Sequence, residues 1–149
     1  KILQKYFKMS SIHFFVEDIN FVLKNKRKIQ KILAILSEKE GKELGEISYI
    51  FCSDNYLLKI NKKYLNADYF TDVITFDYCV GNKISGDIYI SIERVKENSK
   101  IFSQSFFNET LRVILHGALH LCGYKDKKPK EEKIMREKEN FYLNEYSNF

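Results

Sequence analysis

The stretch FFNETLRVILHGALHLCGYKD, residues 106–126, decides the fold. Its first sixteen residues are nearly all apolar, which predicts a helix buried among other elements. His116 and His120 are four residues apart and therefore share one face of that helix. Cys122 lies roughly 200° round the helix from His120, so we expect its thiol to pack elsewhere. The sequence thus predicts a buried helix that presents two imidazoles together near its end.

The residues after this helix offer a third metal ligand. Gly123 suits the left-handed position just beyond a helix end, after which the chain can fold back and bring Asp126 to the histidines. Zinc accepts imidazole and carboxylate ligands, and three protein ligands with one position left for water are typical of catalytic sites. We therefore predict one zinc ion per chain, held by His116, His120 and Asp126. The alternative is that Asp126 only caps the turn or begins the next helix.

The two histidines also have a simpler interpretation as hydrogen-bonded core residues. Metal binding is favoured because unpaired imidazoles in so apolar a helix would be costly to bury, and because a glycine and a carboxylate follow directly. Zinc peptidases with this histidine spacing carry a glutamate after the first histidine as general base. The residue here is Gly117, which disfavours a peptidase.

Hydrophobic periodicity along the rest of the chain alternates between strands and helices. A turn at Gly81-Asn82 joins two adjacent strands as a hairpin. We expect a single α+β domain whose mixed β-sheet of about four strands packs with helices, with the metal site at the end of a buried helix. The expected strands are residues 11–16, 47–51, 72–78 and 84–92. The expected helices are residues 25–40, 53–65, 106–121 and 130–145, and the chain after Glu93 is expected to be helical in general.

Length and composition fit one globular domain. The chain has 149 residues, of which 44% are hydrophobic and 30% charged, so we expect one domain over residues 9–149. Residues 1–8 precede the first methionine, Met9, and are expected to be an N-terminal extension. The net charge of +5 permits an anionic partner without requiring one.

Cysteine usage and hydropathy suggest where the protein works. Cys52, Cys79 and Cys122 are odd in number and form no C-x-x-C pair, which fits a reducing compartment. No apolar run reaches the roughly 18 residues that a membrane span needs. We therefore expect a cytoplasmic protein that does not act in a membrane.

Three acidic residues are candidates for supporting the metal site. Glu109 lies seven residues before His116 on the same helix face, where it could orient an imidazole or simply favour the helix N-terminus. Asp72 and Asp87 each stand at the start of an expected strand and could form walls of the site. Their alternative role is to anchor loops through hydrogen bonds to nearby backbone.

A cluster of basic residues is the candidate for contact with a phosphate-bearing partner. Such a cluster can bind phosphates in a salt-dependent way, although a solvated helix face explains it equally well. Its members are Lys24, Lys26, Arg27, Lys28 and Lys31, with no acidic residue among them.

Residues 116–124, HGALHLCGY, resemble the signature H-G-x-L-H-L-x-G-Y-D-H of the YbeY family of endoribonucleases and rRNA maturation factors. Upstream, residues 61–76 resemble the family segment N-x-x-Y-R-x-x-D-x-P-T-D-V-L-S-F, and GDIYIS at residues 86–91 resembles G-D-I-x-I-S. The resemblance spans residues 61–139. It implies an α+β fold with a sheet backed by helices, one zinc held at the signature, and a role in single-stranded RNA cleavage and ribosome assembly.

The chain departs from this pattern at positions that matter for chemistry. Asp126 stands where the signature has its third histidine, and Lys125 stands where it has aspartate. An anionic ligand lowers the net charge of the site and should make bound water less acidic than three histidines would. Leu65 replaces the family's arginine, and the proline before Thr71 is also absent.

The function that the resemblance implies is a metal-dependent, single-strand-specific endoribonuclease of rRNA maturation, with rRNA and the ribosome or its assembly intermediates as partners. Two alternatives remain open. One is an RNA-binding assembly factor whose metal is only structural, which the missing arginine favours. The other is a metallohydrolase with a substrate other than RNA.

Overall fold

The computed structural model describes residues 11–149, so the expected extension at residues 1–8 lies outside the described residues. Its sheet has four strands in the order β1-β2-β4-β3. The first three are parallel and β3 runs antiparallel to β4, which confirms the mixed sheet and the α+β class. The strands are β1 (Ile12–Val16), β2 (Glu43–Cys52), β3 (Val73–Asp77) and β4 (Lys83–Ser91).

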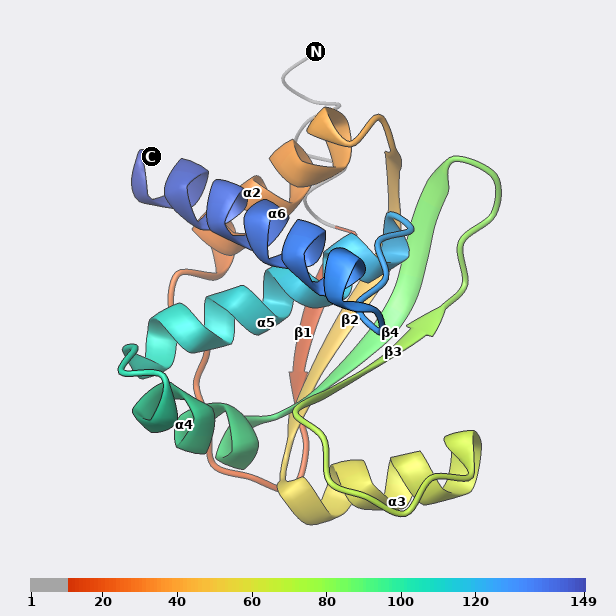
Figure 1. The fold of residues 1–149 in the computed structure, drawn as a ribbon, viewed down its shortest axis with the longest axis vertical. Coiled ribbons are helices and arrows are strands. Elements are labelled where there is room, and N and C mark those ends of the chain that lie inside the picture. The colour runs from red at the N-terminus through yellow and green to blue at the C-terminus, as the bar shows by residue number, and fades with distance from the viewer. Residues whose placement is uncertain (1–10) are drawn as a thin grey trace.

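Helices cover both faces of the sheet unequally. Helices α2, α5 and α6 lie on one face, whereas α3 packs on the other face against β3 and β4 (Figure 1). Helix α2 forms the crossover between the parallel strands β1 and β2. The helices are α2 (Lys26–Lys39), α3 (Asp54–Leu65), α4 (Ile92–Ile101), α5 (Phe106–Leu121) and α6 (Pro129–Ser147).

Most boundaries lie within a few residues of those expected from the sequence. The largest difference is β2, which begins at Glu43 rather than at residue 47. Glu43 and Leu44 pair with the start of β4 before a β-bulge shifts the register. These first residues gain backbone partners from a strand that lies far away in sequence, and Gly45 and Glu46 interrupt the apolar run before Ile47, so local hydrophobicity could not indicate them.

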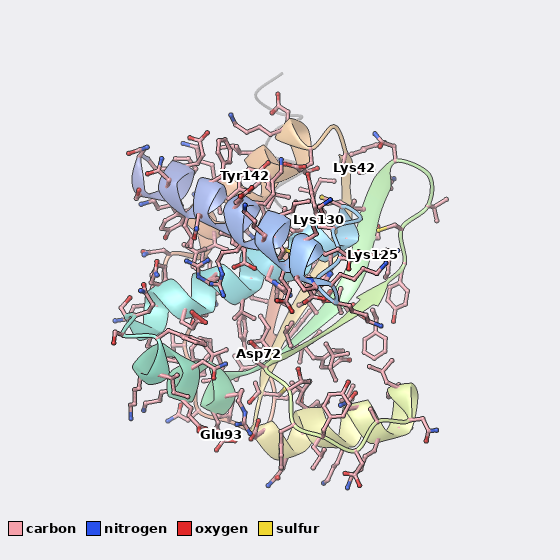
Figure 2. All side chains as sticks on the ribbon, viewed as in Figure 1. Lys42, Asp72, Glu93, Lys125, Lys130 and Tyr142 are labelled. Atoms are coloured by element: carbon pink, nitrogen blue, oxygen red, sulfur yellow. The ribbon has the colours of Figure 1, made fainter. Side chains whose placement is uncertain are left out.

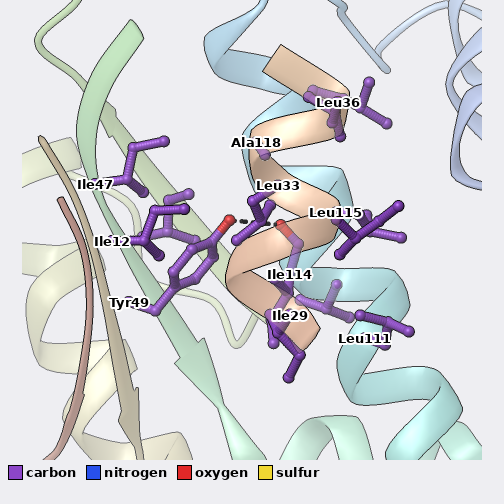
Figure 3. Packing of buried hydrophobic residues seen from close by; sticks show 14 of the residues in the cluster. Ile12, Ile29, Leu33, Leu36, Ile47, Tyr49, Leu111, Ile114, Leu115 and Ala118 are labelled. Carbon is purple, nitrogen blue, oxygen red and sulfur yellow. Dashed lines mark hydrogen bonds between the residues drawn. The ribbon is translucent and has the colours of Figure 1, made fainter. Parts of the chain in front are cut away.

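Helix α5 lies at the centre of the core. Leu111, Ile114, Leu115 and Ala118 are all buried, and they pack with residues of the sheet and of α2 (Figure 3). Tyr49 on β2, which is fully buried, donates a hydrogen bond of 2.8 Å from its hydroxyl to the backbone carbonyl of Ile114. This polar contact inside the apolar core fixes the position of α5 along the sheet.

The C-terminal helix buries only some of its apolar side chains. Ile134 and Phe141 are each 46% exposed. The buried side chains are Met135, Glu139, Tyr142 and Tyr146, at successive spacings of a helix face. A glutamate therefore occupies the buried stripe, where it requires a charged or hydrogen-bonded partner.

The three cysteines are free thiols that pack within the fold. Burial raises the pKa of both Cys52 and Cys122 to about 12, so neither thiol is a reactive thiolate at neutral pH. Cys122 packs against the core, as its helical phase predicted. Within residues 11–149, no helix combines the length and the apolar character needed to cross a bilayer.

Helix α5 approaches β4 closely at Gly117. A Cβ at this position would lie 2.8 Å from Cγ2 of Ile88, a β-branched side chain with little freedom to move. We expect Gly117→Ala to lower the free energy of unfolding, because overpacking costs about 1 to 3 kcal/mol and outweighs a gain in helix propensity of about 1 kcal/mol. Urea denaturation measures the change. In an Ile88→Ala background the same substitution should stabilise the protein, and destabilisation there would contradict the packing explanation.

Candidate metal centre

The chain reverses direction at the end of α5. Gly123 has a φ of 103°, its N–H donates to the carbonyl of His120, and the N–H of Tyr124 donates to the carbonyl of Leu119. These two bonds form the Schellman motif that ends many helices. The expected left-handed glycine is therefore present, and the chain after it turns back over the helix.

This reversal brings three potential ligand atoms together. The Nε2 atoms of His116 and His120 lie 2.9 Å apart. An Oδ2 atom of Asp126 lies 3.1 Å from the first nitrogen and 3.4 Å from the second. Among the described residues, these three form the group of histidine, cysteine and carboxylate side chains able to hold a metal ion. The structure thus assembles the predicted set.

The other nitrogen of each imidazole already has a partner. Nδ1 of His116 lies 2.7 Å from a carboxylate oxygen of Glu139, and Nδ1 of His120 lies 2.8 Å from the backbone carbonyl of Tyr124. Both partners accept hydrogen bonds, so both Nδ1 atoms carry the hydrogen. In the neutral histidines the two Nε2 lone pairs then face each other beside a carboxylate. Such a set of acceptors fits a metal cation, and hydrogen-bonded ligand histidines are usual in metal sites.

Electrostatics around His116 favour positive charge. Burial lowers the pKa of His116, but the hydrogen bond and charge of Glu139, together with the charges of Asp126 and Asp72, raise it above its ordinary value overall. Burial raises the pKa of Glu139, but the hydrogen bonds from His116 and Arg112 lower it below its ordinary value. Glu139 therefore stays ionised, and the site stabilises a cation at the imidazoles.

Glu139, and not Glu109, makes the contact with an imidazole. Arg112 donates a hydrogen bond of 2.9 Å to Glu139 and lies 4.0 Å from Glu109. Glu109 therefore lies beside Arg112 and does not contact His116 directly. The physical reason is distance, because seven residues of helix separate Glu109 from His116 by about 10 Å along the axis. Burial raises the pKa of Glu109, and the nearby charge of Arg112 opposes this.

A second network holds the loop that carries Asp126. The hydroxyl of Tyr124 donates to Glu40 at 2.5 Å, and Tyr142 and Lys138 donate to the other oxygen of the same carboxylate. Glu40 follows α2, whereas Lys138 and Tyr142 belong to α6; Figure 2 shows Tyr142 on that helix. Burial raises the pKa of Glu40, but these hydrogen bonds lower it overall. Tyr124 is therefore fixed at its hydroxyl while its carbonyl holds His120.

The three potential ligands lie in a cleft of about 600 Å³. One wall comes from the end of α3 and from β3, and the other from the end of α5 and the loop after it. Asp72 lines this cleft at the entry to β3 (Figure 2). Burial raises the pKa of Asp72, and the charge of His116 opposes the rise. The cleft floor also holds the hydroxyl of Thr75, which is buried without a hydrogen-bond partner.

Asp87 does not line the cleft. Asp87 alternates along β4 with Gly86 and Ile88, which approach α5, so its side chain lies on the opposite face of the sheet. The sequence could not indicate which face of β4 meets the helix. Strand alternation thus separates Asp87 from the metal centre.

The basic cluster is at the far end of α6. Lys28 lies over the rings of Tyr146 and Phe149, and Lys31 lies over Phe149. The start of α6, which follows Asp126, is about 25 Å from Tyr146 along the helix axis. Any contact of Lys24, Lys26, Arg27, Lys28 or Lys31 with RNA is therefore separate from the metal centre.

Comparison with known proteins identifies the family. The family model described as endoribonuclease YbeY matches residues 12–147. The chain belongs to the YbeY family. The chain is 47% identical to an endoribonuclease YbeY of Parabacteroides distasonis over 87% of this chain and 92% of that protein. It is 51% identical to an endoribonuclease YbeY of Flavobacterium johnsoniae over 83% of this chain and 88% of that protein.

A solved structure supports the same fold. A protein of Thermotoga maritima, determined in solution, superposes with a TM-score of 0.61 at 29% identity, covering 91% of this chain and 88% of that one. The resemblance drawn from the HGALHLCGY signature is thus confirmed, and it extends well beyond the segment where the motifs lie. Within this YbeY fold, the departures from the family pattern take on a structural meaning. Leu65 and Lys125 line the same cleft, and Asp126 occupies the place of the third histidine beside the other two.

Sequence reasoning missed the residues that orient the imidazoles. Glu139 and Glu40 come from segments far from the signature, and neither belongs to the motifs that carry the resemblance. A signal for Glu139 was present, because its position in register with Met135 and Tyr142 places a charge in a buried stripe. Glu40 gave no comparable signal, since a glutamate at a helix end normally points to solvent.

The contact between Glu139 and His116 can be tested by metal affinity. We expect Glu139→Gln to weaken binding of zinc by about tenfold to a hundredfold, because such supporting residues orient the ligand and raise its basicity. Competition with a chromophoric chelator measures the affinity. Glu109→Gln is the matched control, because Glu109 is also buried and lines the same pocket as Glu139 but does not contact an imidazole. This variant should leave the zinc affinity close to the wild-type value. Equal losses in both variants would contradict the assignment.

Proposed function

We propose that this YbeY protein is a zinc-dependent endoribonuclease that cleaves single-stranded RNA during rRNA maturation. The observation that carries this proposal is the convergence of the Nε2 atoms of His116 and His120 with the carboxylate of Asp126 in an open cleft. Endoribonuclease activity is that of the family. What we propose for this chain in particular is the set of metal ligands, the identity of the metal and the natural substrate.

Zinc is the metal that fits this donor set best. Two imidazole nitrogens and one carboxylate oxygen suit zinc, whereas magnesium and calcium prefer oxygen ligands alone. When bound, zinc supplies positive charge that polarises a phosphate and makes water a better nucleophile at neutral pH. We assign one ion per chain to His116, His120 and Asp126.

The protein's own residues prepare the site for such chemistry. Glu139 and the carbonyl of Tyr124 hold the imidazoles in one orientation, so little reorganisation is needed when a cation or substrate enters. Asp72 lies in the same cleft with its pKa raised by burial. A carboxyl group of this kind exchanges a proton nearer to neutral pH than an ordinary aspartate does, which suits it to proton transfer at its oxygen atoms.

We further propose that the protein works in the cytoplasm on rRNA in the ribosome or in its assembly intermediates. Three free thiols suit a reducing compartment. Leu65 in place of the family's arginine favours a second candidate function, in which the protein binds RNA for assembly and its metal only fixes the loop after Gly123. Highly purified, zinc-loaded protein that binds single-stranded RNA without cleaving it would support that second function.

Asp126 decides whether the site has three ligands. We expect Asp126→Ala to weaken zinc affinity severely, Asp126→His to retain zinc because imidazole suits the metal equally, and Asp126→Asn to fall between them. Chelator competition on the three variants measures the order. If Asp126 only caps the turn, Asp126→Ala should cost about 1 kcal/mol of stability and leave zinc affinity unchanged.

Cleavage should depend on the histidine pair. We expect the double variant His116→Ala, His120→Ala to lose cleavage of single-stranded RNA, since it removes two of the three proposed ligands. The triple variant Lys26→Ala, Arg27→Ala, Lys28→Ala should keep the cleavage rate at saturating RNA, and its affinity falls only if the basic cluster contacts RNA. A labelled oligonucleotide resolved on a gel gives both quantities. Cleavage that persists in the histidine variant would locate the activity elsewhere.

A further inference from the structure

Charge in the metal cleft is distributed unevenly between its walls. The lining residues include three acidic side chains, Asp72, Asp77 and Asp126. Among the described residues that line the cleft, Lys125 is the single lysine or arginine. A phosphate group that enters therefore meets several carboxylates and one permanent cation of the protein. Within this cleft, that cation is the side chain that can hold an anion by its charge.

Lys125 is free to take this role. It is exposed, on the loop between α5 and α6 (Figure 2), and within residues 11–149 no ion pair joins it to a carboxylate. Lys138, on the nearby helix α6, is by contrast held by Glu40. The ammonium group of Lys125 therefore need not break an existing ion pair in order to bind a phosphate.

The exchange of residues relative to the family pattern supports the same role. The pattern has arginine at position 65 and aspartate at position 125, whereas this chain has leucine and lysine. Both positions line the cleft, on its two walls. Relative to the pattern, this cleft lacks a cation on the wall of Leu65 and has one on the wall of Lys125.

Tyr69 on the wall of Leu65 offers a surface for a base. Its side chain is 62% exposed, and among the described residues no ring or cation packs on it. Its backbone is nevertheless fixed, because the carbonyl accepts a hydrogen bond of 2.9 Å from Asn61, a residue that is only 1% exposed. The neighbouring Phe70 instead lies against Arg94. Tyr69 therefore combines an anchored backbone with a free aromatic ring.

We propose that Lys125 and Tyr69 form a subsite for one nucleotide of single-stranded RNA, with a phosphate at the ammonium group and the unpaired base stacked on the tyrosine ring. The proposal rests on the proposed function for its substrate class. Stacking on an aromatic side chain requires a base that is free of its helix, so Tyr69 gives a physical reason for preferring single strands. The cation on the opposite wall holds the backbone beside the metal centre.

Binding of RNA tests the Lys125 part without relying on cleavage. The probe is a labelled, unstructured RNA oligonucleotide, titrated with zinc-loaded protein over a series of salt concentrations, with a gel to verify that the RNA stays intact. We expect Lys125→Ala to weaken binding about fivefold at low salt and to reduce the slope of log affinity against log salt by about 0.7, the value for one phosphate contact. Lys100→Ala, which removes an equal charge at the end of α4, should change neither quantity.

Adding Leu65→Arg to Lys125→Ala should restore affinity, because it returns a cation to the other wall. Wild-type affinity and slope in Lys125→Ala, or equal losses in Lys125→Ala and Lys100→Ala, would overturn the phosphate contact. Wild-type protein without affinity for RNA at low salt would overturn the whole subsite.

The Tyr69 part is tested by comparing single-stranded and duplex RNA of the same sequence. We expect Tyr69→Ala to weaken binding of the single strand by about fivefold or more, with Tyr69→Phe close to wild type and duplex binding unchanged. Equal losses on both RNAs would overturn the stacking contact. Wild-type protein that binds but does not cleave would contradict the proposed function alone, whereas cleavage with unaltered binding in these variants would overturn the subsite alone.

Discussion

Burial of α5 against the sheet is the constraint on which the rest of this structure depends. Most side chains of this helix belong to the hydrophobic core. At Gly117 the helix approaches β4 so closely that a side chain there would collide with Ile88. The hydrogen bond from Tyr49 to the carbonyl of Ile114 fixes its position along the strands. Because His116 and His120 are on the same helix, this packing also places the imidazoles, and the last turn of α5 delivers them to the cleft.

Two carboxylates from distant segments stabilise the imidazoles in this apolar helix, one by a direct hydrogen bond and one through Tyr124. Glu139 on α6 accepts from His116 directly, while Glu40 after α2 holds Tyr124, whose carbonyl accepts from His120. Each network leaves an Nε2 atom directed at Asp126. The candidate metal site is thus formed by three helices and one turn, which together determine which nitrogen of each ring is available.

Three departures from the family pattern, Leu65, Lys125 and Asp126, line the same cleft. Asp126 brings a negative charge where the pattern has a neutral imidazole, and the permanent cation is found on the wall of Lys125 instead of the wall of Leu65. These changes lie within one cavity, so they would act on the same phosphate in the proposed subsite. The cleft therefore still has one cation that attracts an anion, but that cation lies on the wall of Lys125 and not on the wall of Leu65.

The sequence by itself determined the α+β class, nearly every helix and strand, and the pairing of His116 with His120, because these depend on local periodicity and on the spacing of side chains along one helix. Gly123 likewise predicted the turn that returns Asp126 to the histidines. Only the tertiary structure decided that Glu139 rather than Glu109 contacts His116, that Asp87 faces away from the site, and that Lys125 shares a cleft with Leu65. Those outcomes depend on which faces of separate elements meet, and contacts between residues distant in sequence leave no periodic signal in either segment.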